Sequence, residues 1–212
     1  MFPFVFGLIL IVFLVLAFIL LDCNPVLIIY DLCDKVFKAK NALKNKTVWI
    51  VGASSGIGEG LAYELARLNC RLILTATNES KLQDVKKRCL TESKDLRPTD
   101  VLLLPYDISE FEQTEAAFRR IIDEFGQLDV LVCNAARFYM GAVADDDFNE
   151  IKRMFDISYF AHVNTIKTVI RYWLEHKLGG QILSTSSVAS ITESPLSSSY
   201  VGCKKALNCF LR

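Results

Sequence analysis

The sequence predicts an α/β protein built on a doubly wound parallel sheet. Short apolar runs alternate with segments of helical periodicity from residue 47 to the end of the chain. The runs are apolar almost throughout, which is typical of strands covered on both faces. A glycine-rich stretch, VGASSGIG (51–58), joins the first run to the first helical segment. Strands that alternate with helices require crossover connections, and therefore parallel pairing.

Each expected element follows from its own local pattern. Strands are expected at 47–51 (TVWIV), 71–75 (RLILT), 101–105 (VLLLP), 129–133 (DVLVC) and 180–185 (GQILST). Helices are expected at 60–68, 79–90, 110–126, about 147–177 and from 198 onward. Leu61, Leu65 and Leu68 recur at helical spacing in the first helix;. Pro105 ends the third strand, and Gly126 closes the third helix;.

The N-terminal segment predicts a membrane anchor. Residues 1–21 carry no charged side chain, and a helix of this length crosses a hydrocarbon core of about 30 Å. A cleaved signal peptide needs a basic start and small residues before the cut, whereas this segment begins MFPF and runs into FILLDC;. We therefore expect a retained signal anchor, followed by an amphipathic linker at 22–46. Lysines within the linker favour a cytoplasmic position for the domain at 47–212;.

Composition argues against several function classes. The chain has 24 basic and 24 acidic residues and no block of like charge, so we expect no nucleic-acid partner;. Its seven cysteines form no CxxC pair and are expected to be reduced, structural thiols;. The two histidines stand alone, so no metal site is expected;.

The glycine-rich stretch predicts a phosphate-binding loop. Gly52 permits the turn out of the strand, Gly56 lets the backbone approach a pyrophosphate, and Gly58 allows close packing of helix on strand. The amide groups that lack partners at the helix start then face the phosphates. The loop therefore predicts a Rossmann-type dinucleotide site, and its other candidate contacts are Ser54, Ser55 and Ile57;.

The spacing Gly-x-x-x-Gly-x-Gly resembles the short-chain dehydrogenase/reductase family, and the sequence around it resembles a membrane-anchored branch of that family. The resemblance covers about residues 47–212. It implies that Asp107, in PYDIS, contacts the adenine, although an aspartate there also suits a turn or a helix cap;. It further implies that Asn134 and Ala135, in CNAA, line the cofactor site. Val51 stands where the family usually has threonine, so one hydroxyl contact is absent.

Tyr200 and Lys204 are four residues apart on an expected helix, and therefore share one face;. An ammonium beside a phenol stabilises the phenolate and makes the phenol a usable acid at neutral pH. The lysine ammonium can also hold the ribose hydroxyls of the cofactor, so Tyr200 and Lys204 are candidate cofactor contacts as well as catalytic residues. Most such pairs are two ordinary surface residues. Ser187 lies 13 residues before Tyr200, however, and this resembles the family's Ser…Tyr-x-x-x-Lys spacing. The resemblance implies that Ser187 binds and orients a substrate carbonyl. Ser158 stands where the family has an asparagine that holds a proton-relay water.

The end of the second strand favours NADP(H) over NAD(H). The resemblance places Ala76 at the position that is acidic in NAD-type relatives, and Thr77 where phosphate-binding relatives often carry arginine. Because this position has no carboxylate, nothing there repels the phosphate on the adenosine ribose of NADP(H);. The hydrogen-bond donors available to that phosphate are Ser54, Ser55, Thr77 and Asn78;.

The expected function is hydride transfer between NADP(H) and a small carbonyl or alcohol substrate. The resemblance implies a lipophilic substrate of the steroid or retinoid type and an endoplasmic reticulum membrane location, and it allows a homodimer. The family continues beyond the last expected helix, so we expect a domain incomplete at its C-terminus and weakly active. The alternatives are a membrane-tethered nucleotide-binding or regulatory protein on the same fold, or a truncated isoform. A methyltransferase on a similar sheet would not need Tyr200 and Lys204.

Overall fold

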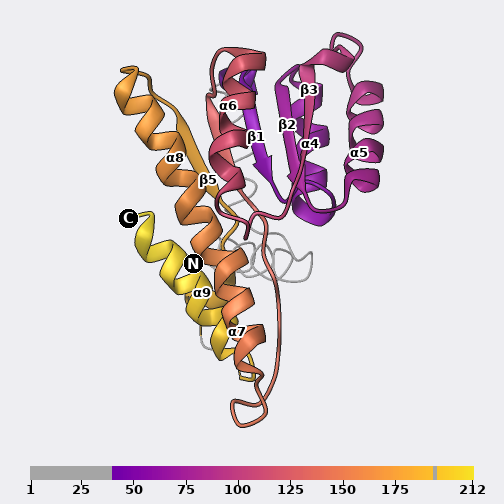
Figure 1. The fold of residues 1–212 in the computed structure, drawn as a ribbon. Helices are drawn as coiled ribbons and strands as arrows, with labels where there is room; N and C mark the ends of the chain where they lie inside the picture. Colours follow the sequence, from indigo (N-terminus) through magenta and orange to yellow (C-terminus); the bar gives the residue numbers. More distant parts are fainter. Residues whose placement is uncertain (1–39, 193–194) are drawn as a thin grey trace, which may run out of the picture. The chain divides into compact units, whose positions relative to one another are not determined.

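A computed structural model describes residues 40–192 and 195–212 (Figure 1). The anchor expected at 1–21 and the linker expected at 22–46, as far as residue 39, lie outside these residues. Within the described part, no helix is long and apolar enough to cross a membrane. A short helix, α3 (Lys40–Leu43), lies at the end of the linker. Residues 44–212 form one compact unit, and this unit carries the candidate site.

The sheet has five parallel strands, which confirms the predicted fold class. They are β1 (Thr47–Val51), β2 (Arg71–Ala76), β3 (Val101–Pro105), β4 (Val130–Cys133) and β5 (Gln181–Ser184). Their order in space is β3-β2-β1-β4-β5. The chain runs outward from β1 to β3 and then crosses back to β4, so the strand order reverses between β1 and β4. Doubly wound sheets bind their ligands at such a reversal, beyond the carboxyl ends of the strands.

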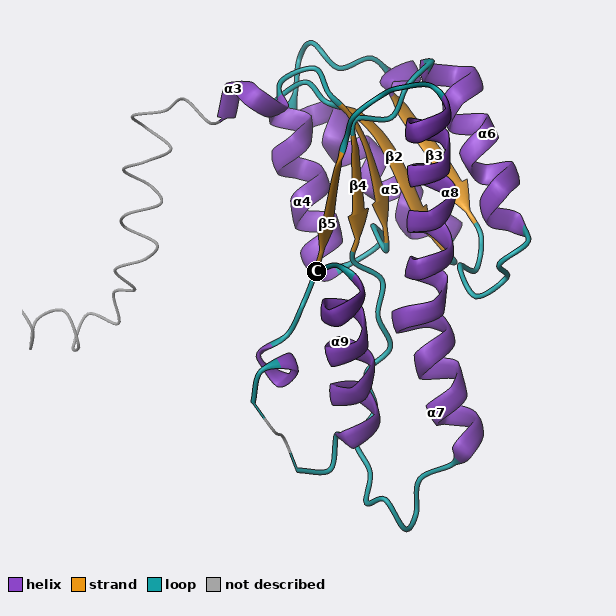
Figure 2. Cartoon of the chain, turned by 90° about the vertical axis from the view of Figure 1, so that its left-hand side faces the viewer, coloured by secondary structure: helices purple, strands orange, loops and turns teal. Residues whose placement is uncertain are grey.

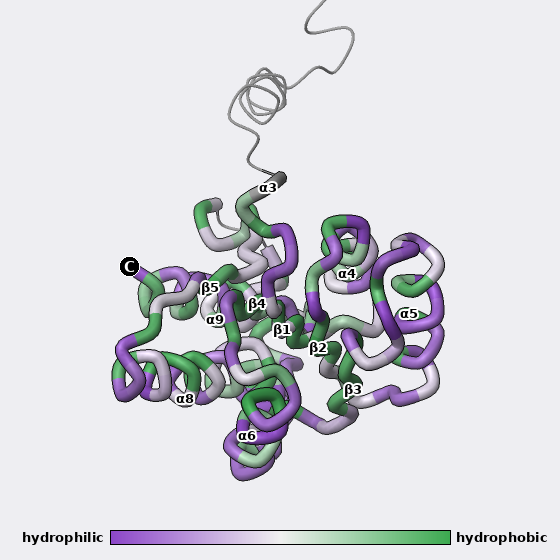
Figure 3. Tube along the Cα trace, turned by 90° about the horizontal axis from the view of Figure 1, so that it is seen from above, coloured by the Kyte–Doolittle hydropathy of each residue, from purple (hydrophilic) through white to green (hydrophobic). Residues whose placement is uncertain are grey.

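Helices cover both faces of the sheet. The longer ones are α4 (Gly56–Arg67), α5 (Glu79–Glu92), α6 (Gln113–Phe125), α7 (Phe148–Phe155), α8 (Ala161–Glu175) and α9 (Ser198–Phe210). The shorter ones are η1 (Pro98–Asp100), η2 (Asp156–Phe160) and η3 (Val188–Ser190). Figure 3 shows α4 and α5 on one face of the sheet and α6 and α8 on the other. In Figure 2, α7 and α9 lie side by side beyond the carboxyl ends of the strands.

The long helix expected at 147–177 is continuous but irregular. It begins with α7 at Phe148 and ends with α8 at Glu175, and the five residues between these helices form a π-helical segment, η2. Segments of this kind are rare and often lie at functional sites.

The main core lies between the sheet and the helices α6 and α8. All five residues of β1 are buried, and because alternate side chains of a strand point to opposite faces, Trp49 and Val51 enter this core together;. They pack with Phe118 of α6 and Val169 of α8. The Trp49 indole N–H donates to Thr75 Oγ1 at 2.8 Å, so its polar atom is satisfied within the apolar layer;. The central strands are therefore a rigid support for the loops at their carboxyl ends.

β5 differs from the expectation that every strand is covered on both faces. Gln181 is exposed and Leu183 is 48% exposed, whereas the residues between and after them are half-buried. β5 is an edge strand, and its alternate side chains point to opposite faces;. Within the described residues, one face of β5 is therefore open to solvent.

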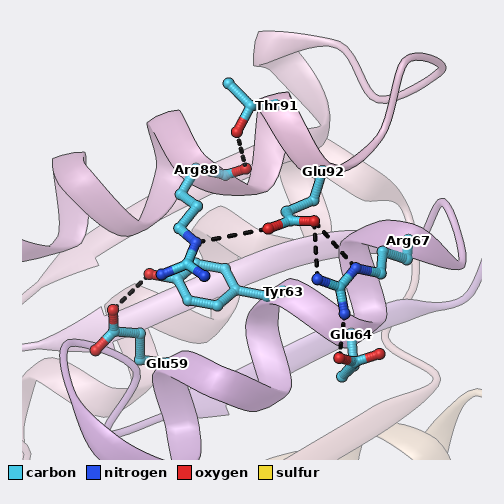
Figure 4. A network of polar contacts seen from close by, with 7 residues as sticks. All are labelled: Glu59, Tyr63, Glu64, Arg67, Arg88, Thr91 and Glu92. Carbon is cyan, nitrogen blue, oxygen red and sulfur yellow. Dashed lines mark hydrogen bonds and ion pairs between the residues drawn. The ribbon is translucent and has the colours of Figure 1, made fainter.

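Polar contacts join α4 and α5 on their outer surface (Figure 4). Arg67 donates to Glu92 at 2.9 Å and also pairs with Glu64, and Arg88 lies 4.2 Å above the centre of the Tyr63 ring. The hydrogen bond from Arg67 holds the pKa of Glu92 below its ordinary value. Exposed ion pairs contribute little to stability, so the buried faces of the two helices hold this layer together.

Candidate active site

A cleft of about 400 Å³ opens at the carboxyl edge of the sheet. Seven of the predicted cofactor-binding residues line it: Gly52, Ser54, Ser55, Thr77, Asp107, Asn134 and Ala135. Ala76 lines it as well. Gly56, Ile57 and Gly58 form the first turn of the adjacent helix α4. The three predicted catalytic residues lie outside the cleft lining: Ser187 immediately before η3, and Tyr200 and Lys204 on α9.

The glycine loop leaves no room for side chains at two of its positions. Gly52 has φ +91°, and a Cβ there would lie 2.5 Å from the backbone nitrogen of Ala135. A Cβ on Gly58 would lie 2.1 Å from the carbonyl oxygen of Gly52. Ile57, between these contacts, is 68% exposed although it is apolar. At Gly52 and Gly58 the loop therefore has room for backbone alone, which fits the close approach of a dinucleotide.

Asp107 closes a turn and also lines the cleft. Its carboxylate accepts hydrogen bonds from the Ser109 backbone N–H at 3.0 Å and from the Ser109 hydroxyl at 2.6 Å, which closes the turn after β3. It also lines the cleft. A carboxylate fixed by its own turn is a preorganised acceptor for a ligand.

Asn134 lies at the centre of a chain of hydrogen bonds. Its side-chain amide donates to the carbonyl oxygen of Gly52 at 2.8 Å. Its side-chain oxygen accepts from the Thr185 hydroxyl at 2.8 Å. The Thr185 carbonyl in turn accepts from Lys204 Nζ at 2.7 Å. The glycine loop and the predicted catalytic lysine are thus connected through Thr185, a residue that the sequence analysis did not identify.

Tyr200 and Lys204 come together on α9. The Lys204 side chain is buried, with 3% of its surface exposed, and its ammonium lies 5.9 Å from the centre of the Tyr200 ring. Burial lowers the pKa of Lys204 below its ordinary value. The Tyr200 ring meets Phe138 edge to face, with 4.9 Å between ring centres. Ser187 follows β5, and its hydroxyl accepts from the Ala189 N–H and caps η3.

Two residues of the long helix hold the segment after β4. The Ser158 hydroxyl, fully buried, accepts from the Arg137 N–H at 3.0 Å and donates to the Arg137 carbonyl at 3.4 Å. His162 lies 2.6 Å from the Ala135 carbonyl, which can only accept, so Nε2 carries the proton;. Burial lowers the pKa of His162 to about 4, and the ring is neutral at pH 7. Ser158, expected to stand where relatives hold a water, therefore binds the backbone instead.

Two arginines are among the residues that line the cleft. Arg137 and Arg153 both line the cleft, from the segment after β4 and from α7. Arg137 Nε donates to Glu150 at 3.0 Å, which fixes its side chain against α7. The sequence carries no signal for either residue, because an arginine in an amphipathic helix or after a strand is usually a solvated surface residue.

These features define a class of protein. A parallel sheet whose strand order reverses beside a glycine loop, with a cleft at that point, is a dinucleotide-binding α/β domain of the Rossmann type. The family profile described as short chain dehydrogenase matches residues 46–212. The chain belongs to the short-chain dehydrogenase/reductase family.

Similar proteins come from animals and from archaea. The chain is 38% identical to dehydrogenase/reductase SDR family member 7 of Mus musculus, over 79% of this chain and 49% of that protein. It is 31% identical to hydroxysteroid 11-beta-dehydrogenase 1-like protein of Xenopus tropicalis, over 92% of this chain and 64% of that protein. The crystal structure of an alcohol dehydrogenase from the archaeon Thermococcus sibiricus, complexed with 5-hydroxy-NADP, matches with a TM-score of 0.72 and 28% identity, over 79% and 68% of the two chains. The chain thus spans about half the length of the mouse relative.

Proposed function

We propose that this protein is an oxidoreductase that transfers a hydride between NADP(H) and a carbonyl or alcohol substrate. The observation that carries the proposal is the connection between the cofactor cleft and the buried ammonium of Lys204, through Asn134 and Thr185. The glycine loop has no side chain at Gly52 and Gly58, where a Cβ would collide with backbone, and therefore suits the close approach of a pyrophosphate;.

In this proposal, bound NADPH supplies the hydride and the protein supplies the proton. The Tyr200 hydroxyl donates its proton to the carbonyl oxygen of the substrate and receives it back during alcohol oxidation. The Lys204 ammonium, on the same face of α9, stabilises the negative charge that Tyr200 carries after donation;. The Ser187 hydroxyl donates to the same carbonyl oxygen and orients it.

The preference for NADP(H) rests on the end of β2. Ala76 and Thr77 line the cleft there, and neither carries a negative charge that would repel a phosphate. Ser54, Ser55, Arg137 and Arg153 line the same cleft. The Thermococcus sibiricus relative, complexed with 5-hydroxy-NADP, supports the preference by analogy.

Ala76→Asp is expected to weaken NADPH binding by about 10–100-fold, because a carboxylate near the phosphate costs about 1–3 kcal/mol in a partly solvated site. Fluorescence titration with NADPH and NADH measures both dissociation constants. Ala76→Asn is the matched control, since it has nearly the same size but no charge, and it should weaken NADPH binding less. The proposal is wrong if the unmodified protein binds NADH more tightly than NADPH.

A lipophilic substrate is proposed from the surroundings of Tyr200. Large apolar side chains are exposed on two segments, the one that follows β4 and the one that follows β5. They are Phe138, Met140, Val143, Val188, Ile191 and Leu196. The Gly141 N–H donates to the Leu196 carbonyl at 2.8 Å and joins the two segments. Exposed apolar groups clustered beside a catalytic centre favour an apolar ligand. The name of the Xenopus tropicalis relative agrees with a steroid-type substrate.

Ser158 favours a second candidate, a nucleotide-binding protein without turnover. Its hydroxyl is fully buried and bonded to both backbone polar groups of Arg137, so it has fewer groups left for a water than the asparagine that the resemblance places there;. The two candidates differ in one measurement. NADPH consumption with a steroid ketone or a retinoid aldehyde supports the oxidoreductase, whereas NADPH binding without consumption across such carbonyl compounds supports the second candidate.

We further propose that residues 1–21 anchor the protein in the endoplasmic reticulum membrane, with the domain at 47–212 on the cytoplasmic side. The uncharged, apolar N-terminal run supports this proposal;. After expression in cells, the full-length chain is expected in the membrane pellet after alkaline carbonate extraction. A variant that lacks residues 1–21 should be released. Release of the unprocessed full-length chain would contradict the anchor.

A further inference from the structure

Thr185 is the only residue of the described chain that bonds both to Asn134 in the cofactor cleft and to Lys204 on α9. Its hydroxyl donates to Asn134 Oδ1 at 2.8 Å, and its carbonyl accepts from Lys204 Nζ at 2.7 Å. Its backbone N–H also donates to the carbonyl of Cys133 at 3.0 Å, which extends the pairing of β4 with β5 by one residue. Three of its polar groups are therefore used, each toward a different residue.

The direction of these hydrogen bonds is fixed by the acceptors. The Gly52 carbonyl can only accept, so the Asn134 amide group must point toward it, at 2.8 Å;. The Asn134 oxygen then faces Thr185, whose hydroxyl must donate. A side chain that fills the same space without a hydroxyl would leave the half-buried Asn134 oxygen without its partner;.

Asn134 also has little freedom to turn elsewhere. A Cβ on Gly58 would lie only 2.6 Å from the Asn134 amide nitrogen, so the Asn134 side chain packs closely against the backbone of Gly58. Its backbone N–H donates to the Val51 carbonyl at 3.0 Å, at the end of β1. A shift of the Asn134 side chain is therefore transmitted to the Gly52 carbonyl, and with it to the turn that begins the loop.

We propose that Thr185 is a positioning residue that fixes the glycine loop, through Asn134, relative to the ammonium of Lys204. Thr185 is not itself one of the residues that line the cleft, and it acts through its two hydrogen-bond partners, of which Asn134 does line it. The inference rests on the proposed function in one respect: the loop that Thr185 holds is the one that binds NADP(H). Its structural part, the coupling of the loop to β5, stands without it.

The first test compares Thr185→Val with Thr185→Ser by NADPH titration of the 212-residue chain in detergent. Valine keeps the size and branching of threonine and removes the hydroxyl, whereas serine keeps the hydroxyl and removes the methyl group. We expect Thr185→Val to raise the dissociation constant for NADPH about fivefold to twentyfold, the usual effect of one unpaired half-buried acceptor. Thr185→Ser should restore binding to within about twofold of the unmodified chain. If Thr185 mattered only for packing, Thr185→Ser would weaken NADPH binding more than Thr185→Val does. That result would overturn the proposal.

The second test asks whether Thr185 acts through Asn134. In an Asn134→Ala background, Thr185→Val should change the dissociation constant by less than about twofold, because the partner of the hydroxyl is already absent. The same fold-change in both backgrounds would show that Thr185 acts by another route.

The third test needs no cofactor, and separates this inference from the proposed function. Hydrogen exchange of the unliganded chain is measured over residues 52–58, with the buried strand at 71–76 as the internal control. Thr185→Val should speed exchange at 52–58 and leave exchange at 71–76 unchanged, whereas Thr185→Ser should leave exchange unchanged in both segments. If the unmodified chain fails to bind NADPH, the proposed function is wrong, yet faster exchange at 52–58 still supports the coupling. Unchanged exchange in Thr185→Val overturns it.

Discussion

Tyr200→Phe is expected to reduce turnover by about 10²–10⁴-fold, the usual contribution of a positioned general acid, with little change in NADPH affinity. The substitution removes only the hydroxyl that donates the proton. The phenylalanine ring keeps the edge-to-face contact with Phe138, whose ring centre is 4.9 Å away. The helix α9 and the position of Lys204 should therefore be preserved. The loss should fall on kcat rather than on KM, because the missing interaction belongs to the proton transfer.

The measurement is the rate of NADPH oxidation with a hydrophobic ketone, together with NADPH titration of both proteins. Tyr172→Phe is the matched control: Tyr172 lies on α8, its ring meets Phe118 edge to face, and it is remote from the cleft lining. This control should keep full turnover. Full turnover of Tyr200→Phe would show that another group supplies the proton.

Gly58→Ala is expected to abolish measurable NADPH binding, with a dissociation constant higher by at least about 100-fold, and to destabilise the domain by about 1–3 kcal/mol, as overpacking does. The new Cβ would lie 2.1 Å from the Gly52 carbonyl oxygen and 2.6 Å from the Asn134 amide nitrogen. Both neighbours belong to the loop and its support, so helix α4 has to move away from the cleft. The amides at its first turn then no longer face a pyrophosphate.

Gly60 offers a matched control two residues further along the same helix. A Cβ on Gly60 meets nothing within 4 Å, and the residue has an ordinary helical backbone. Gly60→Ala should bind NADPH normally and stabilise the helix by up to about 1 kcal/mol. Thermal unfolding and NADPH titration of both variants test the pair. Equal behaviour of the two variants would mean that the close approach at Gly58 is not needed.

The strands and the glycine loop were predictable because their signals are local. TVWIV reads as a strand from β-branched and aromatic residues alone, and VGASSGIG marks the turn from its glycine positions. Parallel pairing and the carboxyl-edge location of the cleft then follow from the alternation of strands and helices. The Tyr200–Lys204 pair was predictable for the same reason, since a separation of four residues on a helix determines which side chains are neighbours.

The supports of the site could not be predicted because they depend on strand register. Thr185 meets Asn134 only because Cys133 is paired with Ser184 at the ends of β4 and β5, and no local pattern fixes that pairing. His162 looked like a lone histidine, since the carbonyl it binds is 27 residues away in the chain. The exposed face of β5 was missed because an apolar run does not distinguish a central strand from an edge strand.

The π-helical segment η2 makes the site depend on a residue count. Met154, Ser158 and His162 are all buried and follow one another at intervals of four residues. In a regular α-helix of 3.6 residues per turn, each step of four residues rotates about 40° beyond a full turn, so such a stripe drifts around the helix. The wider turn at 156–160 absorbs part of that rotation, so Ser158 and His162 both reach the segment after β4, at Arg137 and Ala135. The number of residues between Phe155 and Ala161 thus determines which side chains meet the segment after β4, independently of which amino acids fill those positions.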